Sequence, residues 1–219
     1  MDGRTLLQLI EQGGVVMYPL LFCSVLSIGV IIERLWLLGR TTRASQMLTR
    51  NVLETLREGN IVEAAALCRG STASNAEVLR TALANHGMPA DGVERAVQRR
   101  LGEVTRSMRR NVWLLGTVGS LAPFIGLLGT VLGIIRSFES MAATGSGGFA
   151  VVAAGISEAL IATAGGLLVG VLSIFAYNAF NVRINSLTAT LRDATDEVLQ
   201  RLNELPARDG SLPRVAQSR

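Results

Sequence analysis

The sequence has 219 residues, 49% of them hydrophobic and 17% charged, with a mean hydropathy of +0.38. This balance favours a small polytopic membrane protein over a soluble domain. The net charge is +4 and every basic residue is an arginine. Because these arginines are spread along helical segments without interleaved aromatic residues, nucleic-acid binding is not expected.

The first membrane helix is expected at residues 13–38. The chain is uncharged from Gly13 to Ile32, a run of about the 20 residues that a helix needs to cross a bilayer. Arg34 and Trp36 then suit the membrane interface. The leucine-rich residues 1–12 predict a short interfacial helix on the periplasmic side.

Residues 39–110 form a polar, domain-sized loop with helical periodicity and without strand-like alternation. Two short helices are predicted at 61–67 and 76–85. Asp91, with Glu94 three residues later, begins a longer helix, which we expect to enter the membrane without a break. The helical stripes of this loop contain Met47, Leu48, Val52 and Leu56, and then Val93, Val97, Leu101, Val104 and Met108.

The second membrane helix is expected at 111–135, which is uncharged. Small residues recur along one side of it every three or four positions and form a groove shaped to receive another helix. The glycine-rich end of 136–148 predicts a short, flexible periplasmic connection. The groove contains Gly119, Pro123, Gly126, Thr130, Gly133 and Ser137.

The third membrane helix is expected at 149–182, and Glu158 is the one charged residue between Ser140 and Val182. A carboxylate in a membrane helix is costly, and its first interpretation is therefore functional. The helix has a small-residue side and a bulky side. We expect the bulky side to meet lipid and Glu158 to face protein or a water-filled path.

After the third helix, residues 183–205 predict an amphipathic helix that packs on the loop helices or on neighbouring copies, and 206–219 is expected to be a disordered tail. Of the 21 arginines, 18 lie in the loop 39–112 or in 183–219. The positive-inside rule therefore places both in the cytoplasm and the N-terminus outside.

Two threonines accompany Glu158 in the expected proton pathway. With the second helix running outward and the third inward, Thr130 and Glu158 lie at similar depth, and Thr163 lies deeper. A shielded carboxyl group beside hydroxyls is a minimal site for binding and releasing protons. Two structural alternatives stay open: Glu158 fixes helix register through a buried hydrogen bond, or each threonine bonds its own helix backbone.

Two motifs carry a family resemblance. Leu121 to Ile134 reads LAPFIGLLGTVLGI, and Gly155 to Ala164 reads GISEALIATA. Together they resemble the signature of the ExbB/TolQ/MotA proton-channel family, most of all its ExbB and TolQ branch. Gly14 to Leu21 and Ile32 to Trp36 resemble the first helix of ExbB-like members, so that the likeness covers nearly the whole chain apart from the tail.

The resemblance implies an all-α, three-helix protein of the bacterial inner membrane that assembles as a homopentamer. Its pore would hold two ExbD- or TolR-like single-helix subunits, linked to a TonB- or TolA-like protein. Glu158, Thr130 and Thr163 match the family's polar pore residues, and membrane lipid surrounds the bundle. The residues expected to pack helices and line the pore are Gly119, Pro123, Gly126, Gly129, Gly133, Gly155, Ala162, Gly166 and Gly170.

The function implied is conversion of the proton motive force into work, with protons as the coupling ion and no metal or cofactor. Cys23 and Cys68 lie in different segments without a paired spacing, so neither a disulfide nor a metal site is expected. The alternatives are a flagellar-stator-like or gliding-motility motor and a passive membrane scaffold. A membrane enzyme is disfavoured because Glu158 has no second catalytic group.

Overall fold

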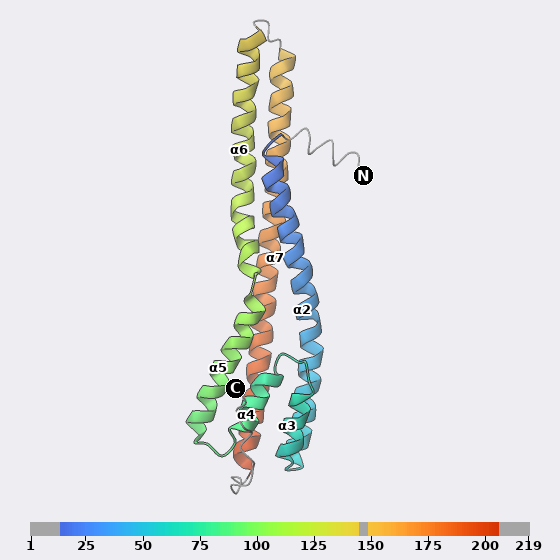
Figure 1. Cartoon of the computed structure of the whole chain (residues 1–219), viewed down its shortest axis with the longest axis vertical. Helices are drawn as coiled ribbons and strands as arrows, with labels where there is room; N and C mark the ends of the chain where they lie inside the picture. The colour runs from blue at the N-terminus through green and yellow to red at the C-terminus, as the bar shows by residue number, and fades with distance from the viewer. Residues whose placement is uncertain (1–13, 145–148, 206–219) are drawn as a thin grey trace, which may run out of the picture. The chain divides into compact units, whose positions relative to one another are not determined.

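The computed structural model describes residues 14–144 and 149–205, and these are helices joined by short turns without a strand (Figure 1). The expected all-α class is thereby confirmed. Three stretches are long and apolar enough to cross a membrane, within Met17–Arg57, Asp91–Ala142 and Val152–Glu204. The expected interfacial helix at 1–12 and tail at 206–219 lie outside the described residues.

The described chain divides into two units. The spanning unit comprises residues 14–35 and 110–182, and the loop unit comprises 36–109 and 183–205. The helices are α2 (Met17–Arg57), α3 (Ile61–Arg69), α4 (Ala76–Ala84), α5 (Ala90–Arg109), α6 (Val112–Thr144) and α7 (Phe149–Glu204).

In the spanning unit, α6 and α7 lie side by side in antiparallel directions (Figure 1). The start of α2 adds to them through a small apolar cluster in which Val16 and Leu20 pack with Val118 and Ala122. The bulky side chains of α7 point outward, as the exposed Leu168 and Phe175 illustrate. The bulky side is therefore free of contacts within the described chain, and its expected contact with lipid stays a prediction.

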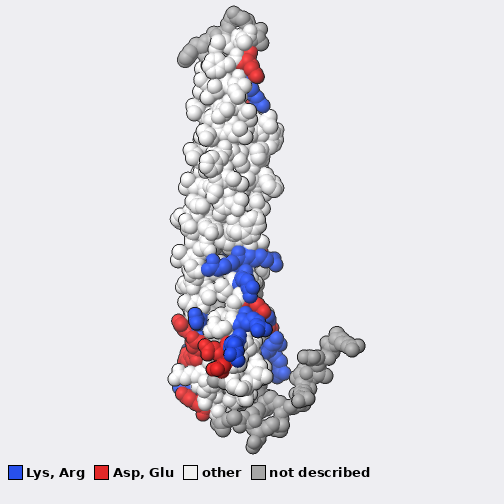
Figure 2. Space-filling model, turned by 90° about the vertical axis from the view of Figure 1, so that its left-hand side faces the viewer, with Lys and Arg blue, Asp and Glu red and all other residues white. Residues whose placement is uncertain are grey.

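The loop unit has its own apolar core, supplied by the stripes that the sequence predicts. Val52 and Leu56 of α2, Val97 of α5, and Ile184 and Val198 of α7 are all buried. The exception is Met47, which is 68% exposed. Charged side chains gather over the helices of this unit on the face drawn in Figure 2.

The last part of α7 packs on α5 of the same chain. Arg109 Nη2 donates a hydrogen bond to Oδ1 of Asn185 at 2.6 Å, and the hydroxyls of Thr105 and Thr188 lie 3.4 Å apart. Of the two expected positions for the amphipathic helix, the structure therefore shows the one on the loop helices.

Both cysteines are free thiols, and burial raises the pKa of Cys68 to about 11.

Two sequence predictions about helix ends are wrong. The helix that begins near Asp91 does not continue into the membrane, because α5 ends at Arg109 and Asn111 has a left-handed backbone (φ 65°) before α6 begins. In addition, α6 runs beyond Ile135 to Thr144, so most of the expected connection at 136–148 is helical. Arg136 and Glu139 interrupt the apolar run, but neither residue disfavours a helix.

Candidate functional site

The groove of small residues on α6 is filled by α7 of the same chain. Gly126 and Gly166 lie at the centre of this contact. A Cβ atom built on Gly166 would lie 2.6 Å from the carbonyl oxygen of Ala122 and 2.9 Å from Cα of Gly126. Only glycine permits such an approach, because a real Cβ at those distances would overlap backbone atoms that cannot move independently.

The same pairing continues toward the Thr144 end of α6. A Cβ on Gly129 would lie 2.8 Å from Cβ of Ala162, and one on Gly133 would lie 2.6 Å from Cβ of Ala159. Ser137 occupies the position that a Cβ on Gly155 would need. The interface is therefore continuous over about three turns of each helix.

It also continues toward the Val112 end of α6. Pro123 is a residue within α6, and its ring packs against Gly170. A Cβ built on Gly170 would lie 2.7 Å from Cγ of Pro123. One turn earlier, a Cβ on Gly119 would lie 3.0 Å from the backbone nitrogen of Ile174. The small residues selected from the sequence thus take part in one helix contact within a single chain.

Thr163 links the two helices by a hydrogen bond. Its hydroxyl donates to the carbonyl oxygen of Gly126 at 2.8 Å, across 37 residues of sequence. The close contact at Gly126 and Gly166 allows this short side chain to reach the neighbouring backbone. The alternative in which Thr163 bonds its own helix is not what the structure shows.

Thr130 behaves differently. Its hydroxyl donates to the carbonyl oxygen of Leu127 at 2.7 Å, three residues back in its own helix. This is the backbone bonding that threonine commonly makes in membrane helices. The contact of Gly133 with Ala159 places Glu158 level with Gly133, so Thr130 lies about one turn of α6 further in.

Glu158 is half-buried, and its carboxylate lies against the backbone just before α2. A Cβ built on Gly14 would be 2.5 Å from Oε1 of Glu158 and 3.6 Å from Nη1 of Arg136. The two side-chain atoms are therefore separated by no more than the sum of those distances, about 6.1 Å. The carboxylate thus lies beside Gly14, with Arg136 close to the same point, whereas both threonine hydroxyls bond backbone carbonyls.

Gly14 and Arg136 lie at this site although they are not among the residues expected there from the sequence. Arg136 is the first charged residue after the uncharged run of α6, and Glu158 lies near the start of α7. Antiparallel pairing of the two helices brings such positions together, so the signal was available. Gly14 carries no comparable signal, because its role depends on how the chain enters α2.

A second polar contact inside the spanning unit joins α2 to α7. The hydroxyls of Ser27 and Ser173 lie 2.9 Å apart, and the two residues are 5% and 1% exposed. Each hydroxyl satisfies the other where water is excluded. This pair fixes the rotation of α2 against α7. The Glu158 carboxylate lies instead against Gly14, just before α2 begins.

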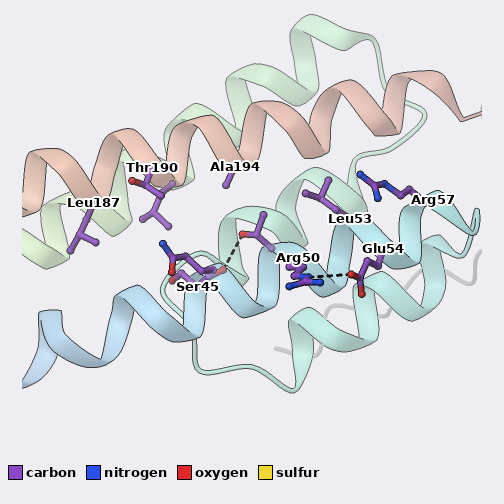
Figure 3. Close-up of a pocket in the computed structure, with 11 residues that line it drawn as sticks. Ser45, Arg50, Leu53, Glu54, Arg57, Leu187, Thr190 and Ala194 are labelled. Carbon is purple, nitrogen blue, oxygen red and sulfur yellow. Dashed lines mark hydrogen bonds and ion pairs between the residues drawn. The ribbon is translucent and has the colours of Figure 1, made fainter.

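The loop unit contains a groove of about 380 Å³ between α2 and α7. Figure 3 shows Leu187, Thr190 and Ala194 of α7 on one side and α2 residues on the other. The lining is mainly apolar, with an ion pair at its edge in which Arg50 Nε lies 3.2 Å from Oε1 of Glu54. Its one acid, Glu54, is 57% exposed and paired with Arg50, whereas Glu158 is half-buried in the spanning unit.

Comparison with known proteins places these features in a family. Residues 71–193 match the model of the MotA/TolQ/ExbB proton channel family. The chain is 35% identical over 179 residues to the putative biopolymer transport protein ExbB-like 1 of Synechocystis, covering 80% of this chain and 68% of that protein.

Two further relatives match over shorter stretches. The biopolymer transport protein ExbB of Salmonella typhimurium is 46% identical over 103 residues, which is 47% of this chain and 42% of that protein. The Tol-Pal system protein TolQ of Pseudomonas aeruginosa is 39% identical over 107 residues, covering 49% and 46%. The chain thus matches less than half the length of these two relatives. It belongs to the MotA/TolQ/ExbB proton channel family.

Proposed function

We propose that the chain is a subunit of a proton-driven motor in the bacterial inner membrane, in which Glu158 binds and releases the transported proton. The observation that carries this proposal is the position of Glu158. It is the one charged residue of the third membrane helix, half-buried where the start of α2, α6 and α7 meet. A charged carboxylate inside a membrane helix costs free energy, and such residues are for this reason usually functional.

The work done is energy transduction of the TonB or Tol type. The named relatives include both ExbB and TolQ, and these names support a role in biopolymer transport or in the Tol-Pal system. Each proton that crosses supplies about 2.3 kcal/mol per 100 mV of membrane potential. A partner that moves with each proton transfer converts that energy into work.

The partner we propose is an ExbD- or TolR-like subunit with a single membrane helix, two copies of which lie in the pore of a homopentamer and connect to a TonB- or TolA-like protein. The outward-facing bulky residues of α6 and α7, such as Phe124 and Phe175, support further helix or lipid contacts in the membrane. The small residues are already used within the chain. Copies therefore meet through the bulky surfaces.

In the same proposal the loop and C-terminal part lie in the cytoplasm and the N-terminus lies outside. The arginine distribution supports this orientation, with 18 of 21 in the loop and the C-terminal segment. Thr163 and Thr130 lie beside the path, with Thr163 holding α6 and α7 together through Gly126. Thr130 bonds the Leu127 carbonyl until a proton or water competes for its hydroxyl.

Replacement of the acid tests the proposal. Glu158→Gln keeps the shape of the side chain but cannot release a proton, so we expect proton flux into proteoliposomes carrying the chain and its co-purified membrane partners to fall at least about 100-fold, with co-purification intact. Glu139→Gln is the matched control, because Glu139 is an exposed acid on α6. Undiminished flux through Glu158→Gln would favour a passive scaffold instead.

A further inference from the structure

We propose that residues 14–17, which lead into α2, form a strap that holds the Glu158 carboxylate and closes it to water on one side. Gly14 and Val16 are then positioning residues for the proton transfer. The inference rests on the proposed role of Glu158 and adds how that acid is held. Its basis is that residues of this strap lie in turn against the carboxylate, against α6 and against α7.

Gly14 is the residue of the strap that faces the carboxylate. A Cβ atom built on it would lie 2.5 Å from Oε1 and 3.7 Å from Cδ of Glu158, and its φ is +68°. A side chain is therefore disfavoured there twice, by the left-handed backbone and by the carboxylate itself. The backbone of the strap thus limits how far the Glu158 side chain can turn toward α2.

Val16 anchors the strap on α6. Its side chain is 9% exposed and packs with Leu20, Val118 and Ala122. A Cβ atom built on Gly129 would lie 3.4 Å from Cγ1 of Val16, so the absence of a side chain on Gly129 leaves room for the valine. Because lifting the strap would expose this buried apolar side chain to water, the closed position is favoured.

The backbone transmits this anchor to Gly14. The N–H of Met17 donates a hydrogen bond to the carbonyl oxygen of Gly14 at 3.1 Å and closes a tight turn. Met17 also lies against α7, since a Cβ atom built on Gly165 would be 3.9 Å from its Cε. An anchor at Val16, inside this turn, therefore also holds Gly14 over the acid.

The exposure of the strap shows which of its sides is covered. Val15 is 61% exposed and Tyr18 is 71% exposed, whereas Val16 between them is buried. The inner side therefore faces the contact of α6 with α7, and the outer side faces away from it. Because Glu158 is half-buried and not enclosed, we assign proton exchange to the side of the carboxylate that the strap leaves open.

Chemical labelling of carboxyl groups tests the strap. A water-soluble carbodiimide with glycinamide converts accessible carboxyl groups to amides in native membranes containing the full-length chain. Mass spectrometry gives the labelling of Glu158 relative to the exposed Glu139 of α6. Val16→Ala removes two buried carbon atoms, so the strap should open more often and this ratio should rise at least about threefold. Val15→Ala is the matched control and should leave the ratio unchanged.

Gly14→Ala tests the strap without removing its anchor. The added methyl group competes with Oε1 of Glu158 for the same space, so the ratio should again rise. Gly29→Ala is its control, because a Cβ there has no atom within 4 Å. A Val16→Ala chain that unfolds at a lower temperature but labels Glu158 at the unmodified ratio would overturn the strap. Failure of the proposed function is a separate result, since it would appear as proton flux persisting in Glu158→Gln.

Discussion

The side-chain amide of Asn111 donates a hydrogen bond to Oε2 of Glu33 at 3.1 Å, joining residues 78 positions apart. The other oxygen of the same carboxylate, Oε1, accepts from Nη2 of Arg34 at 2.7 Å. Arg34 is itself buried, with 2% exposure. The Glu33 carboxylate of α2 thus binds both the buried guanidinium of Arg34 and the side chain of Asn111, which lies between α5 and α6.

The first prediction concerns the backbone at Asn111. Its φ of 65° lies in the left-handed region, which asparagine tolerates better than alanine does. Asn111→Ala should lower the free energy of unfolding by about 1–2 kcal/mol, whereas Asn111→Gly keeps the backbone and loses only the bond to Glu33. Thermal unfolding in detergent micelles measures the difference, and an alanine variant as stable as the glycine variant would contradict it.

The second prediction concerns the contact between α6 and α7. Gly166→Ala places a methyl group 2.6 Å from the Ala122 carbonyl oxygen and should destabilise the spanning unit by about 1–3 kcal/mol, as overpacking does. Gly29→Ala is the control, because a Cβ there has no atom within 4 Å.

Gly126→Leu and Gly166→Leu should prevent assembly by separating the two helices of each chain. Native mass spectrometry that shows an intact oligomer for these variants would show that assembly does not depend on the close contact of α6 and α7.

The third prediction separates the two threonines. Thr163→Val loses the hydrogen bond to the Gly126 carbonyl and should cost about 0.6 kcal/mol, and at most about 1.7, as for other bonds between membrane helices. Thr163→Ser keeps the hydroxyl and should restore most of that loss. Thr130→Val removes only a bond to its own helix and should change stability by less. Equal losses for the two valine variants, measured by thermal unfolding, would show that Thr163 does not hold α6 and α7 together.

The fourth prediction is a pH dependence in the loop unit. The hydrogen bond from the Arg100 guanidinium, aided by Arg80, lowers the pKa of Glu77 below its ordinary value. A carboxyl group whose pKa is lower in the folded state contributes stability above its unfolded pKa and loses that contribution as the pH falls through the folded pKa.

Glu77→Gln should therefore reduce the free energy of unfolding at pH 7 by less than about 1 kcal/mol, because the group is partly exposed, and the difference should vanish at strongly acidic pH. Unfolding midpoints of the full-length chain between neutral and acidic pH measure this. Glu54→Gln is the control, since its partner Arg50 lies on the same helix and is 81% exposed. A Glu77→Gln deficit that grows on acidification would contradict the sign.

The sequence by itself determined the features that depend on local composition. Uncharged runs of about 20 residues predicted the first two membrane helices, and an apolar run with a single charge predicted the third, because the cost of placing charge in lipid depends on each segment alone. Glu158 was identified for the same reason, as the one charge in its segment. The spacing of the small residues in α6 and α7 also predicted a close contact between helices.

Only the tertiary structure decided which groups meet. The hydroxyl of Thr163 crosses to α6 whereas that of Thr130 does not, although the two residue types and their apolar surroundings are alike. The left-handed Asn111 and the approach of Gly14 and Arg136 to Glu158 also depend on residues far away in the sequence. Such contacts arise from the rotation and register of packed helices, and these are set by the whole interface and not by any one segment.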